Sequence, residues 1–147
     1  FSTDGHRLYA GLLSGDVVSW EQVGEVASEG PARGDAAWSD AAKPLGRLCD
    51  APVTALACGT DGQLVLGSAT GSVYVNKALA PAPLTIDSGR YATAATMDPT
   101  SKAIYFGDDQ GSLFRIDDVN QPPRKLADGT GASMTCVKLA DDGERLA

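Results

Sequence analysis

The sequence contains few of the residues from which catalytic and metal sites are usually built. Among its 147 residues there is one histidine, His6, which we place in a turn and do not expect to be catalytic or a ligand. The three cysteines, Cys49, Cys58 and Cys136, show neither a close pair nor metal-ligand spacing, and an odd, scattered set is typical of a reducing compartment. Serine elbows, phosphate-binding loops and dinucleotide fingerprints are also absent. We therefore expect no catalytic residue, no metal and no cofactor.

Basic residues and long apolar runs are scarce too. The formal net charge is -7, from 12 Lys and Arg against 19 Asp and Glu, and the basic grouping at residues 124–125 is too small to neutralise a run of phosphates. No stretch approaches the roughly 18 consecutive apolar residues of a membrane span. The acidic pairs at residues 108–109 and 117–118 lack the spacing of a calcium loop. We expect neither direct nucleic-acid binding nor membrane insertion.

Glycine is plentiful, and it punctuates a short pattern that recurs along the chain. Copies ending in Asp-Gly lie at residues 1–5, 58–62 and 139–143, with a degenerate copy at residues 97–102. A second, glycine-bounded turn lies at residues 11–15, 67–71 and 107–111. The last two of these turns are 40 residues apart, a period typical of four-stranded propeller blades.

The runs between these turns are short and apolar on both faces. Asp-Gly between two such runs favours a hairpin, because glycine adopts a positive φ without steric cost. Residues 64–66 (Leu-Val-Leu) and 104–106 (Ile-Tyr-Phe) do not alternate between apolar and polar side chains. A sheet with one face in water would alternate, so sheets packed between two neighbours are favoured over an open sheet.

Several copies of the pattern resemble the WD-repeat family, in which an inner strand ends in Phe-Ser-Pro-Asp-Gly. Residues 53–62 (Val-Thr-Ala-Leu-Ala-Cys-Gly-Thr-Asp-Gly) and residues 134–143 fit it, and residues 15–21 (Gly-Asp-Val-Val-Ser-Trp-Glu) resemble the family's next segment. The family's Gly-His pair is missing. The resemblance implies an all-β fold, a β-propeller fragment of four-stranded antiparallel WD-repeat-like blades. It also places Cys58 and Cys136 in inner strands, where we expect Cys58 to be a small buried hydrophobe.

The repeat sets the expected boundaries. One β-propeller domain spans the chain, divided into a partial blade 1–50, blades 51–90 and 91–131, and the start of a further blade at 132–147. We expect strands at residues 53–59, 64–68 and 73–76 with an outer edge at 84–87, and at residues 91–97, 103–107 and 113–116. The number of blades is below the roughly four to eight of a closed propeller. We therefore expect a piece of a larger propeller; the alternative is completion by another subunit.

One insertion interrupts the repeat. Gly15 and Gly71 are 56 residues apart, and the excess falls in residues 23–43, ahead of an outer strand expected at residues 45–49. The segment is rich in small and acidic residues, a composition typical of a loop, and Trp38 is its one large apolar residue. It is either a tolerated surface insertion or a docking arm anchored by Trp38.

The turns and the connections between blades are the expected contact surface. The turns at residues 69–70 and 108–110 and the connections at 50–51, 88–90 and 130–131 should share one rim, which the family uses for partners. The candidate protein contacts are Arg90, Tyr91, Asp108, Asp109, Gln110 and, in the insertion, Trp38. Arginine and tyrosine are enriched among residues that dominate binding energy, although Tyr91 could equally fill an interface between blades. Arg115 takes a position that is apolar in the preceding blade, so we expect an ion pair between blades or a side chain that reaches the edge.

Three classes of function are compatible with these features. The resemblance implies a non-catalytic protein–protein interaction scaffold, a subunit of a larger multiprotein assembly. A static structural module of such an assembly is closely related. The alternative is a quinoprotein-like or other enzymatic propeller, which would carry a tryptophan motif in every blade or acidic metal ligands near the central channel. We expect an intracellular protein, cytoplasmic or nuclear, including cytoskeletal or ciliary assemblies.

Overall fold

The structure is a computed structural model that describes residues 1–2, 4–23, 37–60, 62–76, 83–85 and 90–139. The described residues form β-strands and turns without a helix, which confirms the expected all-β class. The strands are β1 (Arg7–Gly11), β2 (Asp16–Val23), β3 (Ala37–Trp38), β4 (Lys43–Arg47), β5 (Val53–Cys58), β6 (Leu64–Ser68), β7 (Ser72–Asn76), β8 (Pro83–Thr85), β9 (Ala92–Met97), β10 (Ile104–Asp108), β11 (Leu113–Ile116) and β12 (Arg124–Ala127).

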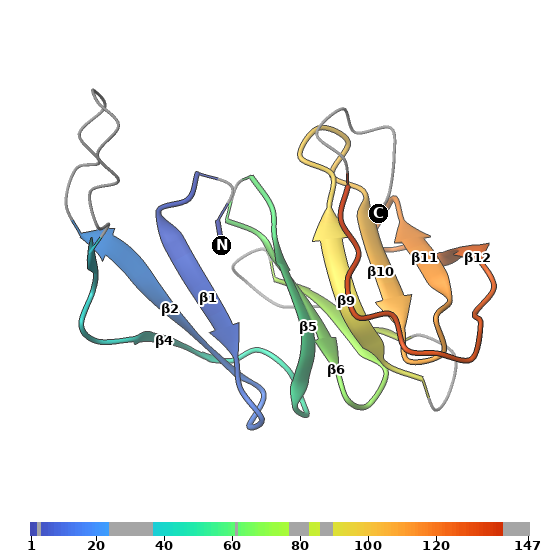
Figure 1. Ribbon diagram of the computed structural model, residues 1–147, viewed down its shortest axis with the longest axis horizontal. Helices are drawn as coiled ribbons and strands as arrows, with labels where there is room; N and C mark the ends of the chain where they lie inside the picture. Colours follow the sequence, from blue (N-terminus) through green and yellow to red (C-terminus); the bar gives the residue numbers. More distant parts are fainter. Residues whose placement is uncertain (3, 24–36, 61, 77–82, 86–89, 140–147) are drawn as a thin grey trace.

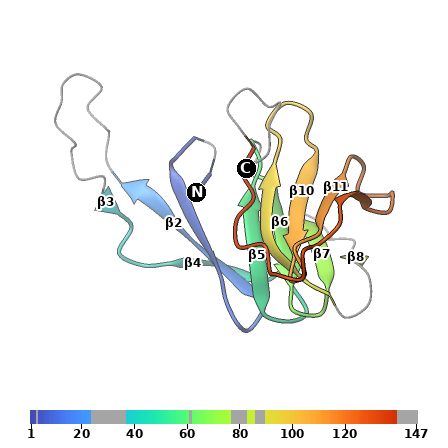
Figure 2. The same cartoon turned by 45° about the vertical axis from the view of Figure 1, so that its right-hand side comes forward.

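The strands form three antiparallel sheets that stand side by side (Figures 1 and 2). In the first sheet β2 pairs with β1, β3 and β4; the second has the order β5-β6-β7-β8 and the third β9-β10-β11-β12. The strands expected in the second and third sheets are present with bounds that agree within about one residue, and residues 86–87 of the expected outer edge lie outside the described residues. The described sheets do not close on one another.

The packing between sheets explains why the strands are apolar on both faces. Alternate residues of a strand point to opposite faces, so Leu64 and Leu66 of β6 pack with Val17 of the first sheet, while Val65 packs with the third. Phe106 of β10 is fully buried in the cluster between the second and third sheets. The middle sheet is thus covered on both sides, as the lack of alternation predicted.

The first sheet departs from the expected boundaries in two places. Strand β4 spans Lys43–Arg47 and not 45–49, because the amides of Leu48 and Cys49 already bond to the carbonyl of Gly15 and turn the chain toward the second sheet. Part of the expected loop is also paired, since Ala37 and Trp38 form β3 against Val23 and Gln22. Residues 24–36 of the insertion lie outside the described residues.

The expected inner strand at residue 134 and beyond is not formed in the described part of the chain. Residues 128–138 make no ladder, and Leu139 packs against Ala103 and Tyr105. An inner strand needs the following strand for its ladder, and residues 140–147, where that strand would begin, are not described. Cys136 is exposed, and Cys58 is half-buried rather than fully buried, whereas Cys49 is 3% exposed.

Candidate functional site

The turns and inter-sheet connections gather along one edge, the lower edge in Figure 1. The connection between the first and second sheets bonds to the turns of both, and the two later connections bond to the turn of the third sheet through Tyr91 O and the Gly131 amide. The amide of Val53 donates to Leu12 O at 3.1 Å, and the amide of Ala69 donates to Pro52 O at 3.0 Å. We call this edge the turn rim; it comprises residues 12–15, 50–52, 69–71, 90–91 and 108–111. The expected segments 50–51, 69–70, 108–110 and 130–131 share this edge together with residue 90, and residues 88–89 lie outside the described residues.

Glycines let the turns and connections cross closely. Gly71 has φ of 86°, and a Cβ there would lie 2.2 Å from the carbonyl oxygen of Arg90. Gly15 and Gly111 repeat this arrangement beneath the carbonyls of Cys49 and Ala132. Each position needs both the left-handed backbone and the missing side chain, so the rim has a backbone framework that repeats from sheet to sheet.

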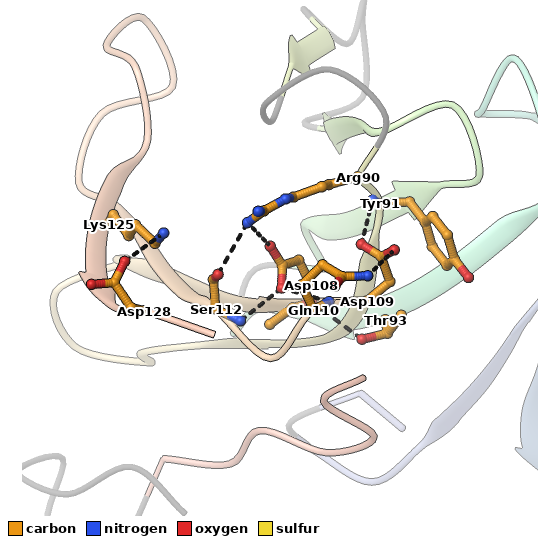
Figure 3. Close-up of polar contacts among 10 residues, drawn as sticks. Arg90, Tyr91, Thr93, Asp108, Asp109, Gln110, Ser112, Lys125 and Asp128 are labelled. Atoms are coloured by element: carbon orange, nitrogen blue, oxygen red, sulfur yellow. Dashed lines mark hydrogen bonds and ion pairs between the residues drawn. The ribbon is translucent and has the colours of Figure 1, made fainter. Parts of the chain in front are cut away.

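Asp108 organises the rim at the third sheet. Its side chain is fully buried, and its Oδ1 accepts hydrogen bonds from the amides of Gln110 at 3.0 Å and Ser112 at 2.7 Å. Its Oδ2 forms an ion pair with Nη1 of Arg90 at 3.4 Å (Figure 3). The burial places Asp108 beneath the surface, where it holds the turn and orients Arg90.

Arg90 joins the turn to the connection that precedes β9. Its Nη1 also donates to Oγ of Ser112 at 3.3 Å, and 36% of its side chain stays exposed. The nearby Asp128 carboxyl has its pKa lowered, first by its bond to Lys125 and also by the charge of Arg90. The guanidinium is therefore fixed on its inner side and open to solvent on its outer side.

The other predicted contacts of the rim lie beside Arg90. Tyr91 is 36% exposed, and its amide donates to Oδ1 of Asp109 at 3.3 Å. Gln110 is exposed and donates from Nε2 to Oδ2 of Asp109 at 3.2 Å. The structure therefore brings together five of the six predicted residues, with Asp108 as the buried support (Figure 3).

Trp38 lies elsewhere. Figure 2 shows β3, the strand that holds Trp38, at the far end of β2. Trp38 pairs there with Gln22, and its ring lies 5.9 Å from that of Phe1. It is half-buried by this contact. Trp38 cannot share a compact contact surface with Arg90.

Asp50 is a rim residue whose role the sequence did not indicate. Its Oδ1 accepts hydrogen bonds from Oγ of Ser68 at 3.0 Å and Oγ1 of Thr70 at 3.1 Å. The hydroxyl of Tyr74, the largest cause, and these two hydroxyls hold the pKa of Asp50 below its usual value. The available signal was the two hydroxyl residues of the turn, Ser68 and Thr70, whose side chains need an acceptor nearby.

Arg115 makes its ion pair and its ring contact with residues of its own sheet. Its Nε donates to Oδ1 of Asp117 at 2.6 Å, and its guanidinium lies over the ring of Tyr105, 5.4 Å from the centroid. The ion pair links two residues at the end of one strand and does not bridge two sheets. The side chain reaches the edge, as the second of the two expectations stated.

Hollows between the sheets occur at the edge opposite the turn rim. One of about 470 Å³ includes Arg7 and Glu21, which pair with each other at 3.3 Å. Another of about 540 Å³ includes Lys102 and Asp117, of which Asp117 binds Arg115. In the described part of the chain, buried side-chain polar atoms all have partners, and no cluster of three or more His, Cys, Asp or Glu could hold a metal.

No helix in the described ranges is long and apolar enough to cross a membrane. Compared with known proteins, the chain matches no family model, and a search of curated proteins finds no match either.

Proposed function

We propose that the chain is part of a non-catalytic protein–protein interaction scaffold, a WD-repeat-like propeller subunit of a larger assembly. The observation that carries the proposal is the turn rim, where a buried carboxylate and close backbone crossings hold Arg90, Tyr91 and Gln110 at the surface. Rigid presentation lowers the entropy lost on binding, and arginine and tyrosine contribute strongly to interface energy. A scaffold also needs no catalytic group.

The propeller reading is supported by the repeat of four-stranded meanders at regular spacing. The enzymatic alternative would be marked by a tryptophan motif in every blade or by acidic metal ligands near a central channel. The positions in register with Trp20 are Asn76 and Ile116, so the described sheets carry no such repeat. The partners proposed are other proteins of a large complex, in the cytoplasm or nucleus.

Arg90→Ala in the full-length protein tests the proposal. We expect this variant to lose at least one binding partner that the wild type retains in affinity purification with quantitative mass spectrometry. Asp109→Ala should weaken the same partner, because it removes the acceptor that fixes Tyr91. Arg124→Ala is the matched control, since Arg124 is an exposed arginine on β12, away from the turn rim. Unchanged capture by both rim variants would overturn the use of this surface.

A further inference from the structure

The turn of the first sheet exposes two leucines where the other turns are polar or small. Leu12 is 40% and Leu13 84% exposed. Their counterparts in register are Ser68 and Ala69 in the second sheet and Asp108 and Asp109 in the third. Both leucines therefore depart from the chemistry of a turn that the chain builds twice elsewhere.

This departure has a structural cost. The hydroxyl of Ser68 accepts a hydrogen bond from the amide of Thr70 at 3.2 Å, and Asp108 accepts the corresponding one from Gln110. A leucine side chain at this position has no acceptor, so the turn of the first sheet is built without this stabilising hydrogen bond. Large exposed apolar side chains that weaken their own turn indicate a role in binding and not in folding. Sequences depart from local structural preferences chiefly at functional sites.

The next sheet along the rim presents a fixed negative charge. Asp50 is exposed, and hydroxyls from Ser68 and Thr70 hold its carboxylate in place. The connection that carries Asp50 lies against the leucine turn, since the Leu12 carbonyl bonds to the Val53 amide. Stacked sheets are about 10 Å apart, which an extended chain spans in roughly three residues at about 3.3 Å each.

We propose that the turn rim binds an extended segment of a partner protein in which an apolar residue is followed, three positions later, by lysine or arginine. The apolar side chain covers Leu12 and Leu13, and the cation pairs with Asp50. The net charge of -7 favours the approach of such a basic segment. The inference rests on the proposed function, because it names the partner chemistry of the same rim.

Peptide binding to the full chain measures this directly. The probe is a fluorescent nine-residue peptide of Gly, Ser and Thr carrying Leu and, three positions later, Arg; comparison peptides move the Arg next to the Leu or replace it with Glu. We expect the first peptide to bind at least tenfold more tightly than either comparison peptide, by fluorescence anisotropy. Equal binding of the Arg and Glu peptides, or binding of the chain to anionic vesicles in preference to the peptide, would overturn the proposal.

The chain supplies its own matched variant. Leu12→Ser with Leu13→Ala copies the first two turn residues of the second sheet, so the melting temperature should be unchanged or higher while peptide binding falls at least tenfold. A lower melting temperature would show that the leucines serve the fold and would overturn the proposal. Asp50→Lys should reverse the preference, so that the Glu peptide binds better than the Arg peptide; an unaltered preference would remove Asp50 from the site.

The two proposals fail separately. Loss of partner capture in Arg90→Ala tests the scaffold function, and it does not depend on the leucines. If Arg90→Ala loses a partner while the leucine variant keeps both that partner and the peptide, the scaffold function stands and the leucine–aspartate site is wrong.

Discussion

At the scale of single residues, the hydrogen-bonded carboxylate of Asp50 makes stability depend on pH. Its pKa is lowered in the folded state by the hydroxyls of Tyr74, Ser68 and Thr70. A lowered folded pKa contributes stability above the ordinary aspartate pKa of about 4, and that contribution is lost as the pH falls through the lower folded value.

We therefore predict that Asp50→Asn reduces the fall in melting temperature at acid pH. The wild-type melting temperature should fall as the pH drops from about 5 toward 3, and the variant should start lower and fall less over this interval. Scanning calorimetry at a series of pH values measures the difference. Asp40→Asn, at an exposed aspartate in the segment before β4, is the control. If the variant loses as much stability as the wild type between about pH 5 and about pH 3, other carboxylates account for the loss of stability at acid pH.

The sequence predicted the position of a residue where a neighbouring turn or the repeat fixes that position. His6 was placed in a turn because of the Asp-Gly beside it, and Arg90 and Tyr91 were placed at the rim by the repeat. The burial of Asp108 was out of reach, because the corresponding residues are Leu12 and Ser68 and neither indicates a buried charge. Only the approach of Arg90 and two backbone amides makes that position suitable for a carboxylate.

At the scale of elements, two glycines of the second sheet have the same backbone conformation but different surroundings. Gly62 and Gly71 have φ of 75° and 86°; a Cβ at Gly62 meets nothing within 4 Å, whereas one at Gly71 meets the Arg90 carbonyl at 2.2 Å. The position in register with Gly62 in the third sheet is Lys102, with φ of 64°. The turn between the first and second strands of a sheet, which holds Gly62 or Lys102, therefore tolerates a side chain.

We predict that Gly71→Ala destabilises the protein more than Gly62→Ala. The backbone term alone is about 1 kcal/mol for each, and the overlap at Gly71 should bring its loss to about 3 kcal/mol or more. Chemical denaturation of the two variants gives the comparison, with Gly62→Ala as the matched control. Equal losses would mean that the connection at Arg90 moves aside without cost.

Element boundaries were predictable where glycine turns and apolar runs coincide, as they do for β6 and β11. The predicted boundaries were wrong where a contact between distant parts of the chain determines the end of a strand. Strand β4 ends at Arg47 because Leu48 and Cys49 are drawn to Gly15, a contact between residues more than thirty positions apart that no local pattern shows.

At the scale of the whole molecule, one contact repeats between successive sheets. The residue that opens the next inner segment packs on a glycine of the preceding sheet, as Val53 does on Gly11, Ala92 on Gly67 and Met134 on Gly107. A threonine follows each time, and those at 54 and 93 donate to a carbonyl of the next unit. The order in which the three described sheets stack follows from this repeated contact.

The insertion in the first sheet should be separable from the stack. Val23 and Ala37 are paired residues of β2 and β3, so a short turn can join them as a hairpin. We predict that replacing residues 24–36 with a short Gly-Ser turn in the full-length protein shifts the melting temperature by only a few degrees. Changing loop length by this amount alters the closure entropy by about 1 kcal/mol.

Trp38 provides the comparison that separates folding from docking. It stays in the shortened protein, where it pairs with Gln22 and contacts Phe1, so a loss of partner binding on shortening alone would assign docking to residues 24–36. Loss only in Trp38→Ala, with the melting temperature kept, would assign it to the tryptophan. Unfolding of the shortened protein would show instead that the first sheet needs these residues, and that the pairing of β2 with β3 does not suffice to hold its edge.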